Sequence, residues 1–340
     1  MDIFHVDPGY GRGLTVSNGS VSCVESDEYN PINGVAFTCL ASDSTAASVN
    51  LALPADFPSY LPNHTHWLGL RFSAYLDIQS SNYFACGFGE RSRIEFSENR
   101  AIAYMSLDIN LLAITSQVLT NSLTSGFHNI ALSIYVKRVE QNYYIYLYAD
   151  VDGYTWYANT EKAYGNLYNG HNYIFGSTSG IRFTFPTSST DICYISNIIA
   201  AHQPSTDENL TSDMLLAKLP LSTPLTTSDF LSAGDGEYVG TTSGQKLLSA
   251  INAGENSDVI TKFGATSKVS HIITYGNPGY RVGSNVTSAT GISQSGNDSI
   301  TAHGNCSLSA DADAAACVAW EADAGTKLSD LDGLKVGWQV

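Results

Sequence analysis

Hydrophobic and polar positions alternate over several long stretches of the first 200 residues. In residues 67–78 the apolar side chains recur at every second position, at Leu70, Phe72, Ala74, Leu76 and Ile78. A period of two over this length is typical of a β-strand with one buried face. The same period, or a β-branched and aromatic composition, predicts further strands at residues 127–136, 143–153, 180–185 and 192–198. No amphipathic helix is predicted before residue 200, so the strands indicate an antiparallel two-sheet sandwich or jelly roll.

The second half of the chain has shorter patterns, separated by Gly, Asn and Pro. Residues 209–217 predict a short helix that Pro220 and Pro224 would stop. Residues 244–251 predict a strand or a turn, and strands are expected at 259–263, 269–275 and 282–287. One helical turn within 326–334 then precedes a last strand at 335–340. These elements indicate a second, smaller β-sandwich.

The distribution of aromatic residues places a domain boundary near residue 205. Seventeen of the 20 tyrosines and 11 of the 13 phenylalanines come before it. The stretch 201–209 is polar and contains Pro204, as linkers between domains often do. We therefore expect two domains, residues 1–205 and residues 206–340.

The composition excludes some classes of function. Charged residues make up only 14% of the chain, and the formal net charge is −16. We expect no nucleic-acid binding, because phosphate contacts need clustered Lys and Arg. We also expect no membrane insertion, since no apolar stretch approaches the roughly 20 residues that span a bilayer. The N-terminal residues show no secretory signal peptide, so any extracellular role would depend on transport in a particle.

The six cysteines form no Cys-x-x-Cys pair, so common zinc-ribbon and thioredoxin-like spacings are absent. At this density the thiols are expected to be unpaired, buried small side chains. Cys23 with Cys39 and Cys306 with Cys317 are the alternative disulfide candidates.

Several short motifs of the first half resemble the concanavalin A-like, or laminin-G-like, jelly-roll family. They are the opening Gly11-Arg12-Gly13-Leu14, the strand at Trp67, the Asp-x-Asp-Gly hairpin at residues 150–153 and the closing strand at 192–198. Their order along the chain is the one expected for that family. The resemblance implies a jelly-roll sandwich for residues 1–205.

The second half is similar to a module found at the C-terminus of many tailed-bacteriophage tail proteins. The similarity lies in the strand within 267–281 and in the ending 319–340, where Trp320, a short helix and a glycine-containing final strand follow one another. The chain departs from that pattern at Asp311-Ala312-Asp313, which lacks a proline, and at an apparent insertion over 322–327. The resemblance implies a virion protein.

Catalytic patterns are missing from the sequence. Glu25, Asp27 and Glu28 lack the spacing that would point three carboxylates from one strand into a cleft, and Glu321 with Asp323 has no third acid. No Gly-x-Ser-x-Gly elbow, P-loop or dinucleotide fingerprint occurs. His64 and His66 have no third metal ligand nearby. We therefore expect no enzymatic activity.

Two features have the chemistry of binding. Asp150 and Asp152 could supply oxygen ligands to Ca²⁺, the only cofactor considered; the alternative is a hairpin turn that uses the Asp-Gly pair. Tyr154, Trp156 and Tyr157 could stack on sugar rings. The alternatives for these aromatic residues are a subunit contact or the hydrophobic core.

Together these patterns predict a non-enzymatic structural protein of a phage virion, made in the host cytoplasm and located in the tail tip, the baseplate or a fibre. Its expected partners are other virion proteins, further copies of itself in a homo-oligomer, and host-surface glycans. Three alternatives remain open, namely a free carbohydrate-binding module, a capsid decoration protein and a polysaccharide-degrading enzyme.

Overall fold

The computed structural model describes most of the 340-residue chain. The described residues are 2–54, 66–80, 82–88, 92–106, 114–139, 142–159, 164–165, 180–204, 210–222, 230–234, 237–240, 246–276, 286–308 and 316–340. None of the helices among them is long and apolar enough to cross a membrane.

The chain forms two compact units. Unit 1 comprises Met1–Asp2 and Asp7–Leu216, and unit 2 comprises Ile3–Val6 and Ala217–Val340. Strand β1 (Asp2–Asp7) therefore contributes residues to both. The stretch that the sequence suggested as a linker begins inside a strand, because β16 (Ile192–Pro204) continues through Pro204.

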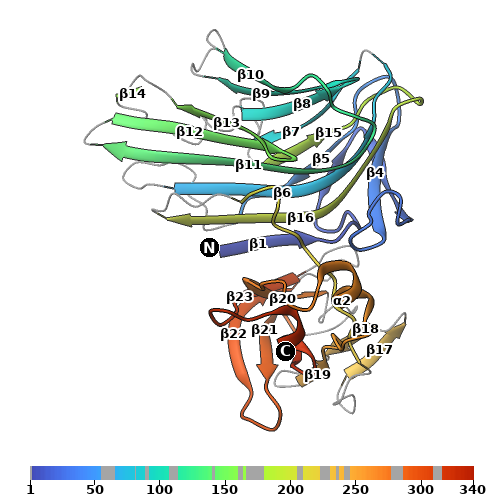
Figure 1. Ribbon diagram of the computed structural model, residues 1–340, viewed down its shortest axis with the longest axis vertical. Helices are drawn as coiled ribbons and strands as arrows, with labels where there is room; N and C mark the ends of the chain where they lie inside the picture. Colours follow the sequence, from blue (N-terminus) through green and yellow to red (C-terminus); the bar gives the residue numbers. More distant parts are fainter. Residues whose placement is uncertain are drawn as a thin grey trace. The chain divides into compact units, whose positions relative to one another are not determined.

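Unit 1 contains two large antiparallel sheets. The larger sheet has the order β13-β12-β11-β6-β16-β4-β3, and its long strands lie side by side in Figure 1. The strands are β13 (Tyr154–Asn159), β12 (Asn142–Val151), β11 (Gly126–Val139), β6 (His66–Asp77), β16, β4 (Val35–Ala41) and β3 (Gly19–Glu25), with β14 (Tyr164–Gly165) paired to β12.

The smaller sheet has the order β10-β9-β8-β7-β15-β5-β2. Its strands are β10 (Ile114–Thr120), β9 (Arg100–Ser106), β8 (Ser92–Ser97), β7 (Phe84–Phe88), β15 (Ile181–Thr184), β5 (Ser48–Leu51) and β2 (Thr15–Ser17). The expected all-β class and the concanavalin A-like jelly-roll sandwich are confirmed.

Aromatic side chains join the two sheets. Phe72 of the larger sheet packs edge to face against Phe84 and Phe183 of the smaller one, with ring centroids 6.3 and 5.1 Å apart. Each such ring, fully buried, contributes about 1.5–3 kcal/mol of transfer free energy. The strand predicted at 67–78 is confirmed as β6, and its Leu70, Phe72, Ala74 and Leu76 are buried at every second position. The face of β6 that carries Phe72 is therefore its inner face.

Unit 2 is built from smaller sheets. A hairpin joins β17 (Phe230–Gly234) and β18 (Glu237–Gly240); a four-stranded sheet has the order β19-β24-β21-β22; and β20 pairs with β23. The bounds are β19 (Lys246–Ala250), β20 (His271–Gly276), β21 (Ser288–Gln294), β22 (Thr301–Ser307), β23 (Ala316–Glu321) and β24 (Lys335–Gln339). A Cβ atom at Gly291 of β21 would lie 2.7 Å from Cγ1 of Val318 in β23, so these two sheets pack face to face.

The strand predicted at 259–263 is wrong, because these residues belong to helix α2 (Asp258–Phe263). The hydroxyl of Ser257 accepts a hydrogen bond from the backbone NH of Ile260, and Gly264 ends the helix at a φ of 84°. An N-cap serine and a glycine after the last turn are strong helix boundaries. These local signals outweighed the β-branched residues that suggested a strand.

The short helix predicted at 209–217 is also wrong in its described part. Residues 210–216 are irregular apart from a turn, in which the NH of Met214 bonds to the carbonyl of Thr211. Side chains from elsewhere in unit 1 form hydrogen bonds with backbone groups in this segment. Asp150 accepts a hydrogen bond from the NH of Ser212, and Asn33 donates one to the carbonyl of Leu216.

The remaining predictions for the second half mostly hold. Strand β19 forms within 244–251, and β20 corresponds to the strand predicted at 269–275. The 3₁₀ turn η1 (Leu328–Leu331) and the final strand β24 confirm the predicted ending. The strand predicted at 282–287 falls mostly outside the described residues, and residues 286–287 are not in a strand.

Burial of His5 in strand β1 makes stability depend on pH. Burial lowers the pKa of His5 from 6.5 to about 4. Its contribution to stability is therefore complete above about pH 6.5 and is lost as the pH falls toward 4, by up to about 3 kcal/mol. We expect urea denaturation between pH 7 and pH 4 to show this loss, and His5→Phe to have a shallower slope over the same range. Equal slopes in the two proteins would contradict the prediction.

Candidate functional site

The outer face of the larger sheet in unit 1 carries a row of buried polar side chains. Arg71 and Ser73 of β6 point away from the core, and Asn129 of β11 lies directly opposite Ser73. Arg71 and Ser73 are 0% exposed. A buried charged group is costly unless it is paired and hydrogen-bonded, so the partners of Arg71 explain how this face is built.

The guanidinium of Arg71 donates three hydrogen bonds. Its Nη2 bonds to Oδ1 of Asn129 at 2.6 Å, and its Nη1 bonds to Oγ of Ser73 at 2.9 Å and to the carbonyl of Asn197 at 3.2 Å. Ser73 also donates to Oδ1 of Asn129. Burial lowers the pKa of Arg71 to about 10, while the carboxylate of Asp213 acts in the opposite direction. Arg71 therefore remains charged at neutral pH.

Asn197 joins this cluster to two loops of unit 1. It has a φ of 54° at an irregularity in β16, a backbone conformation that Asn tolerates better than most residues. Its side-chain amide donates to Oδ1 of Asn30 at 3.0 Å, and its own Oδ1 accepts from Asn33 at 2.5 Å. We call Arg71, Ser73, Asn129, Asn197, Asn30 and Asn33 the Arg71 network. It fixes the loop after β3 and, through Asn33 and Leu216, the segment that ends unit 1.

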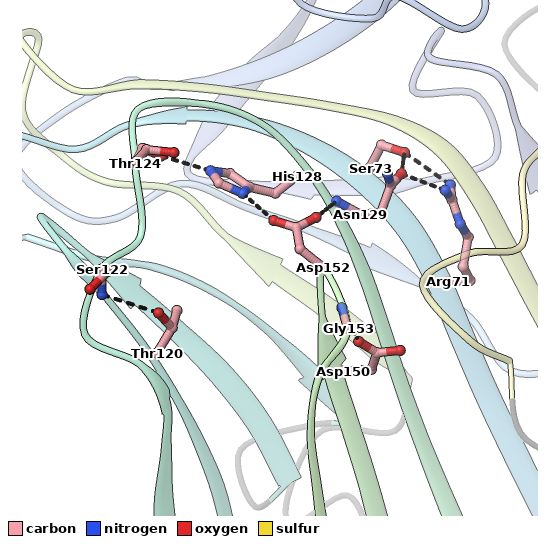
Figure 2. Close-up of polar contacts among 10 residues, drawn as sticks. All are labelled: Arg71, Ser73, Thr120, Ser122, Thr124, His128, Asn129, Asp150, Asp152 and Gly153. Atoms are coloured by element: carbon pink, nitrogen blue, oxygen red, sulfur yellow. Dashed lines mark hydrogen bonds and ion pairs between the residues drawn. The ribbon is translucent and has the colours of Figure 1, made fainter.

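The two aspartates proposed for Ca²⁺ are engaged in hydrogen bonds of the hairpin (Figure 2). Asp152 accepts from the NH of Asn129 at 2.8 Å and contacts Nδ1 of His128 at 2.6 Å. Asp150 accepts from the NH of Gly153, the NH of Ser212 and the hydroxyl of Tyr148. All four carboxylate oxygens thus have protein partners, and the described residues hold no group of three or more candidate metal ligands.

The backbone at residues 152–153 has the geometry of a hairpin turn. Asp152 has a φ of 50° and Gly153 a φ of 87°. Two consecutive positive φ values are typical of the tight turn that an Asp-Gly pair favours between antiparallel strands. This geometry is the hairpin turn that the sequence analysis gave as the alternative to a Ca²⁺ site at Asp150 and Asp152.

The three candidate aromatic residues lie on two faces of β13. Tyr154 and Trp156 pair with Val151 and Ala149, which face the core, whereas Tyr157 pairs with Tyr148 on the outer face. Tyr154 is 56% exposed, Tyr157 is 68% exposed, and Trp156 is half-buried. The rings of Tyr157 and Tyr148 have centroids 4.8 Å apart. The structure therefore brings Tyr157 together with Tyr148 and Asp150, and separates it from Trp156.

Tyr148 is held firmly beneath Tyr157. It is buried, and its hydroxyl donates to Oδ2 of Asp150 at 2.8 Å. Burial, followed by the bond and charge of Asp150, raises the pKa of Tyr148. Tyr148 therefore stays a neutral hydrogen-bond donor. The Tyr157 ring packs against this side chain, whose position is held by its hydrogen bond to Asp150.

The other sequence candidates lie apart from this face. Glu25 ends β3, and Asp27 and Glu28 follow in a turn closed by the bond from the NH of Ser26 to the carbonyl of Gly34. His64, Asp311 and Asp313 are outside the described residues, as is the side chain of His66. All six cysteines are free, and the disulfide alternatives do not form. Cys23 is exposed, and its thiol donates to the carbonyl of Tyr10.

Sequence reasoning missed the Arg71 network. The sequence did contain one indication of this network, because Arg71 is a charged residue in the middle of an apolar strand. Its asparagine partners are far away in sequence, however, and belong to a residue type that is common in loops. Only the strand register brings Ser73 and Asn129 opposite each other.

No protein-family model matches the sequence, and no curated protein matches it either. Solved structures show low similarity. They include a conserved carbohydrate esterase from the Shiga toxin-encoding bacteriophage phi24B, at 11% identity and a TM-score of 0.37, over 56% of this chain and 89% of that one.

Two further structures are similar at the same level. Peanut lectin has 11% identity and a TM-score of 0.33, over 61% of this chain and 99% of the lectin. The CBM2 module of the evolved Dit of Lactobacillus casei BL23 phage J-1 has 10% identity and a TM-score of 0.31, over 61% of this chain and 97% of the module. Similarities of this size define neither a family nor a function for this chain.

The Arg71 network predicts strong coupling between two of its members. Asn129→Ala removes the acceptor of Arg71 Nη2 and leaves a buried charge under-bonded, so we expect a loss of about 2–4 kcal/mol in the free energy of unfolding. Adding Arg71→Met removes that charge and should recover part of the loss. A double-mutant cycle by chemical denaturation measures the coupling.

The matched control is Asn99→Ala at an exposed turn, which should change stability by less than about 0.5 kcal/mol. Additive effects of Asn129→Ala and Arg71→Met would contradict the network as the source of the loss.

Proposed function

We propose that the chain is a non-enzymatic structural protein of a phage virion, a component of the tail that contacts neutral glycans on the host surface. The observation that carries the glycan contact is the exposed Tyr157 ring on the outer face of β13, supported by Tyr148 and Asp150. An exposed aromatic face on a rigid base offers a sugar ring an apolar surface without an ordering cost at the moment of binding.

The surroundings of Tyr157 favour an uncharged ligand. Asp150 is buried, and its carboxylate is already occupied by donors from Tyr148, Gly153 and Ser212. Its carboxylate therefore has no oxygen left without a protein donor. Asp213, which is exposed, adds a negative charge near Tyr148 and disfavours an acidic ligand. A net charge of −16 also disfavours acidic sugars at long range.

A place in the virion tail is supported by the C-terminal resemblance and by the low charge content. The pattern of Trp320, a short helix and a final strand is present in the structure as β23, η1 and β24. A surface poor in charge suits contact with many protein neighbours, because unpaired charges are costly to bury. The proposed partners are other virion proteins and further copies of this chain.

Substitution of Tyr157 tests the glycan contact. We expect Tyr157→Ala in the full chain to weaken binding to immobilised host-surface polysaccharide at least tenfold, which corresponds to about 1.4 kcal/mol, and Tyr157→Phe to retain binding. Tyr154→Ala is the matched control, since Tyr154 is equally accessible but lies on the opposite face of the same strand. Unchanged binding by Tyr157→Ala, or no binding by the unmodified chain, would contradict the proposal.

A density map of the intact particle tests the structural role. We expect the chain in the tail tip, baseplate or a fibre, in several symmetry-related copies that contact other tail proteins. Location on the head would instead favour the capsid decoration protein, and absence from purified particles would favour the free carbohydrate-binding module.

A further inference from the structure

A hollow in unit 1 lies at one end of the smaller sheet. Strands β7, β15 and β5 are neighbours in that order, and β15 runs antiparallel to both of the others. The end of β15 therefore meets the beginnings of β7 and β5, and Thr184 pairs with both Ala85 and Ser48. The residues just outside these strand ends are brought together.

These residues line an open cleft of about 90 Å³, which we call the Tyr83 cleft. Its lining residues are Ala46, Asn82, Tyr83, Thr184, Phe185, Pro186 and Thr187. None of them is charged. The volume is several times that needed for one water molecule, so the cleft has room for the edge of a small ring.

The cleft combines an accessible aromatic ring with unused polar groups. Tyr83 is 47% exposed. Within the described part of the chain, the side-chain amide of Asn82 and the hydroxyl of Tyr83 make no hydrogen bond to protein. An aromatic face beside free amide and hydroxyl groups is suited to a ligand that is apolar on one face and rich in hydroxyls at its edge.

The walls of the cleft are fixed by contacts beneath them. Asp191 accepts hydrogen bonds from the NH groups of Gln79 and Ser80, and Ser80 in turn accepts one from the NH of Asn82 at 3.0 Å. On the other wall, the NH of Phe185 donates to the carbonyl of Ala47 at 2.9 Å, and its ring packs on Phe84. Prepositioned walls reduce the entropy lost when a ligand binds.

We propose that the Tyr83 cleft binds one neutral pyranose residue, with the sugar ring on Tyr83 and its hydroxyl groups on Asn82. The site is separate from Tyr157, which belongs to the other sheet. A neutral sugar fits better than an anionic one, because the lining offers no cation to pair with a carboxylate.

Saturation-transfer NMR on the full chain tests this site directly. The probes are glucose, galactose, mannose and N-acetylglucosamine at millimolar concentration, with glucuronic acid as the anionic comparison. We expect transfer to at least one neutral sugar and at least tenfold weaker binding of it by Tyr83→Ala. Tyr83→Phe should retain transfer, and Asn82→Ala should weaken it. Tyr83 is exposed, so its truncation leaves the core intact.

Tyr154→Ala serves as the matched aromatic control and should retain transfer to the monosaccharide. Tyr157 belongs to the proposed glycan contact, so Tyr157→Ala is measured both alone and together with Tyr83→Ala, and the double variant should show less transfer than Tyr157→Ala. This arrangement separates the two sites, because loss in Tyr157→Ala alone would assign the sugar to the outer face of β13 and overturn the Tyr83 cleft. Absence of transfer to every neutral sugar, or equal transfer in Tyr83→Ala, would overturn it as well.

Discussion

The burial of one positive charge on the outer face of the larger sheet constrains the rest of unit 1. Arg71 is 0% exposed, so its guanidinium needs hydrogen-bond acceptors from the protein around it. Asn129 and Ser73 come from the sheet, the carbonyl of Asn197 comes from an irregularity in β16, and Asn197 extends the network to the loop after β3. Because a buried charge without acceptors would cost several kcal/mol, these segments have to hold their positions together.

This arrangement limits where a ligand can bind. The segment that ends unit 1 is tied to the same face, through the NH of Ser212 on Asp150 and the carbonyl of Leu216 on Asn33. The polar centre of the sheet is therefore used for internal bonding. Accessible aromatic rings remain at the margins of the sandwich, at Tyr157 on the outer strand and at Tyr83 beside the strand ends.

The sequence predicted the sandwich well, because the alternation of apolar and polar side chains over β6 and β11 is a local signal of a strand with one apolar face. It predicted the ends of elements less well. Residues 259–263 have the β-branched content of a strand, but Ser257 and Gly264 define a helix between them. The candidate site depended on register. Tyr154, Trp156 and Tyr157 are close in sequence, yet a period of two places Tyr157 on the other face, and Arg71 found partners from strands far along the chain.

Three of the chain's charged side chains are used inside unit 1. Asp7, Arg71 and Asp150 are buried, and each is hydrogen-bonded within unit 1; Asp7 alone accepts from the NH groups of Gly9, Tyr10 and Gly11. Some of the few charges therefore stabilise loops and strands and are not available to partners. Charged residues make up only 14% of the chain, and the accessible side chains include a few aromatic rings, such as Tyr83 and Tyr157. Under the proposed function, such a surface would recognise ligands by stacking and hydrogen bonds, with little dependence on salt, which is the chemistry that neutral sugars offer.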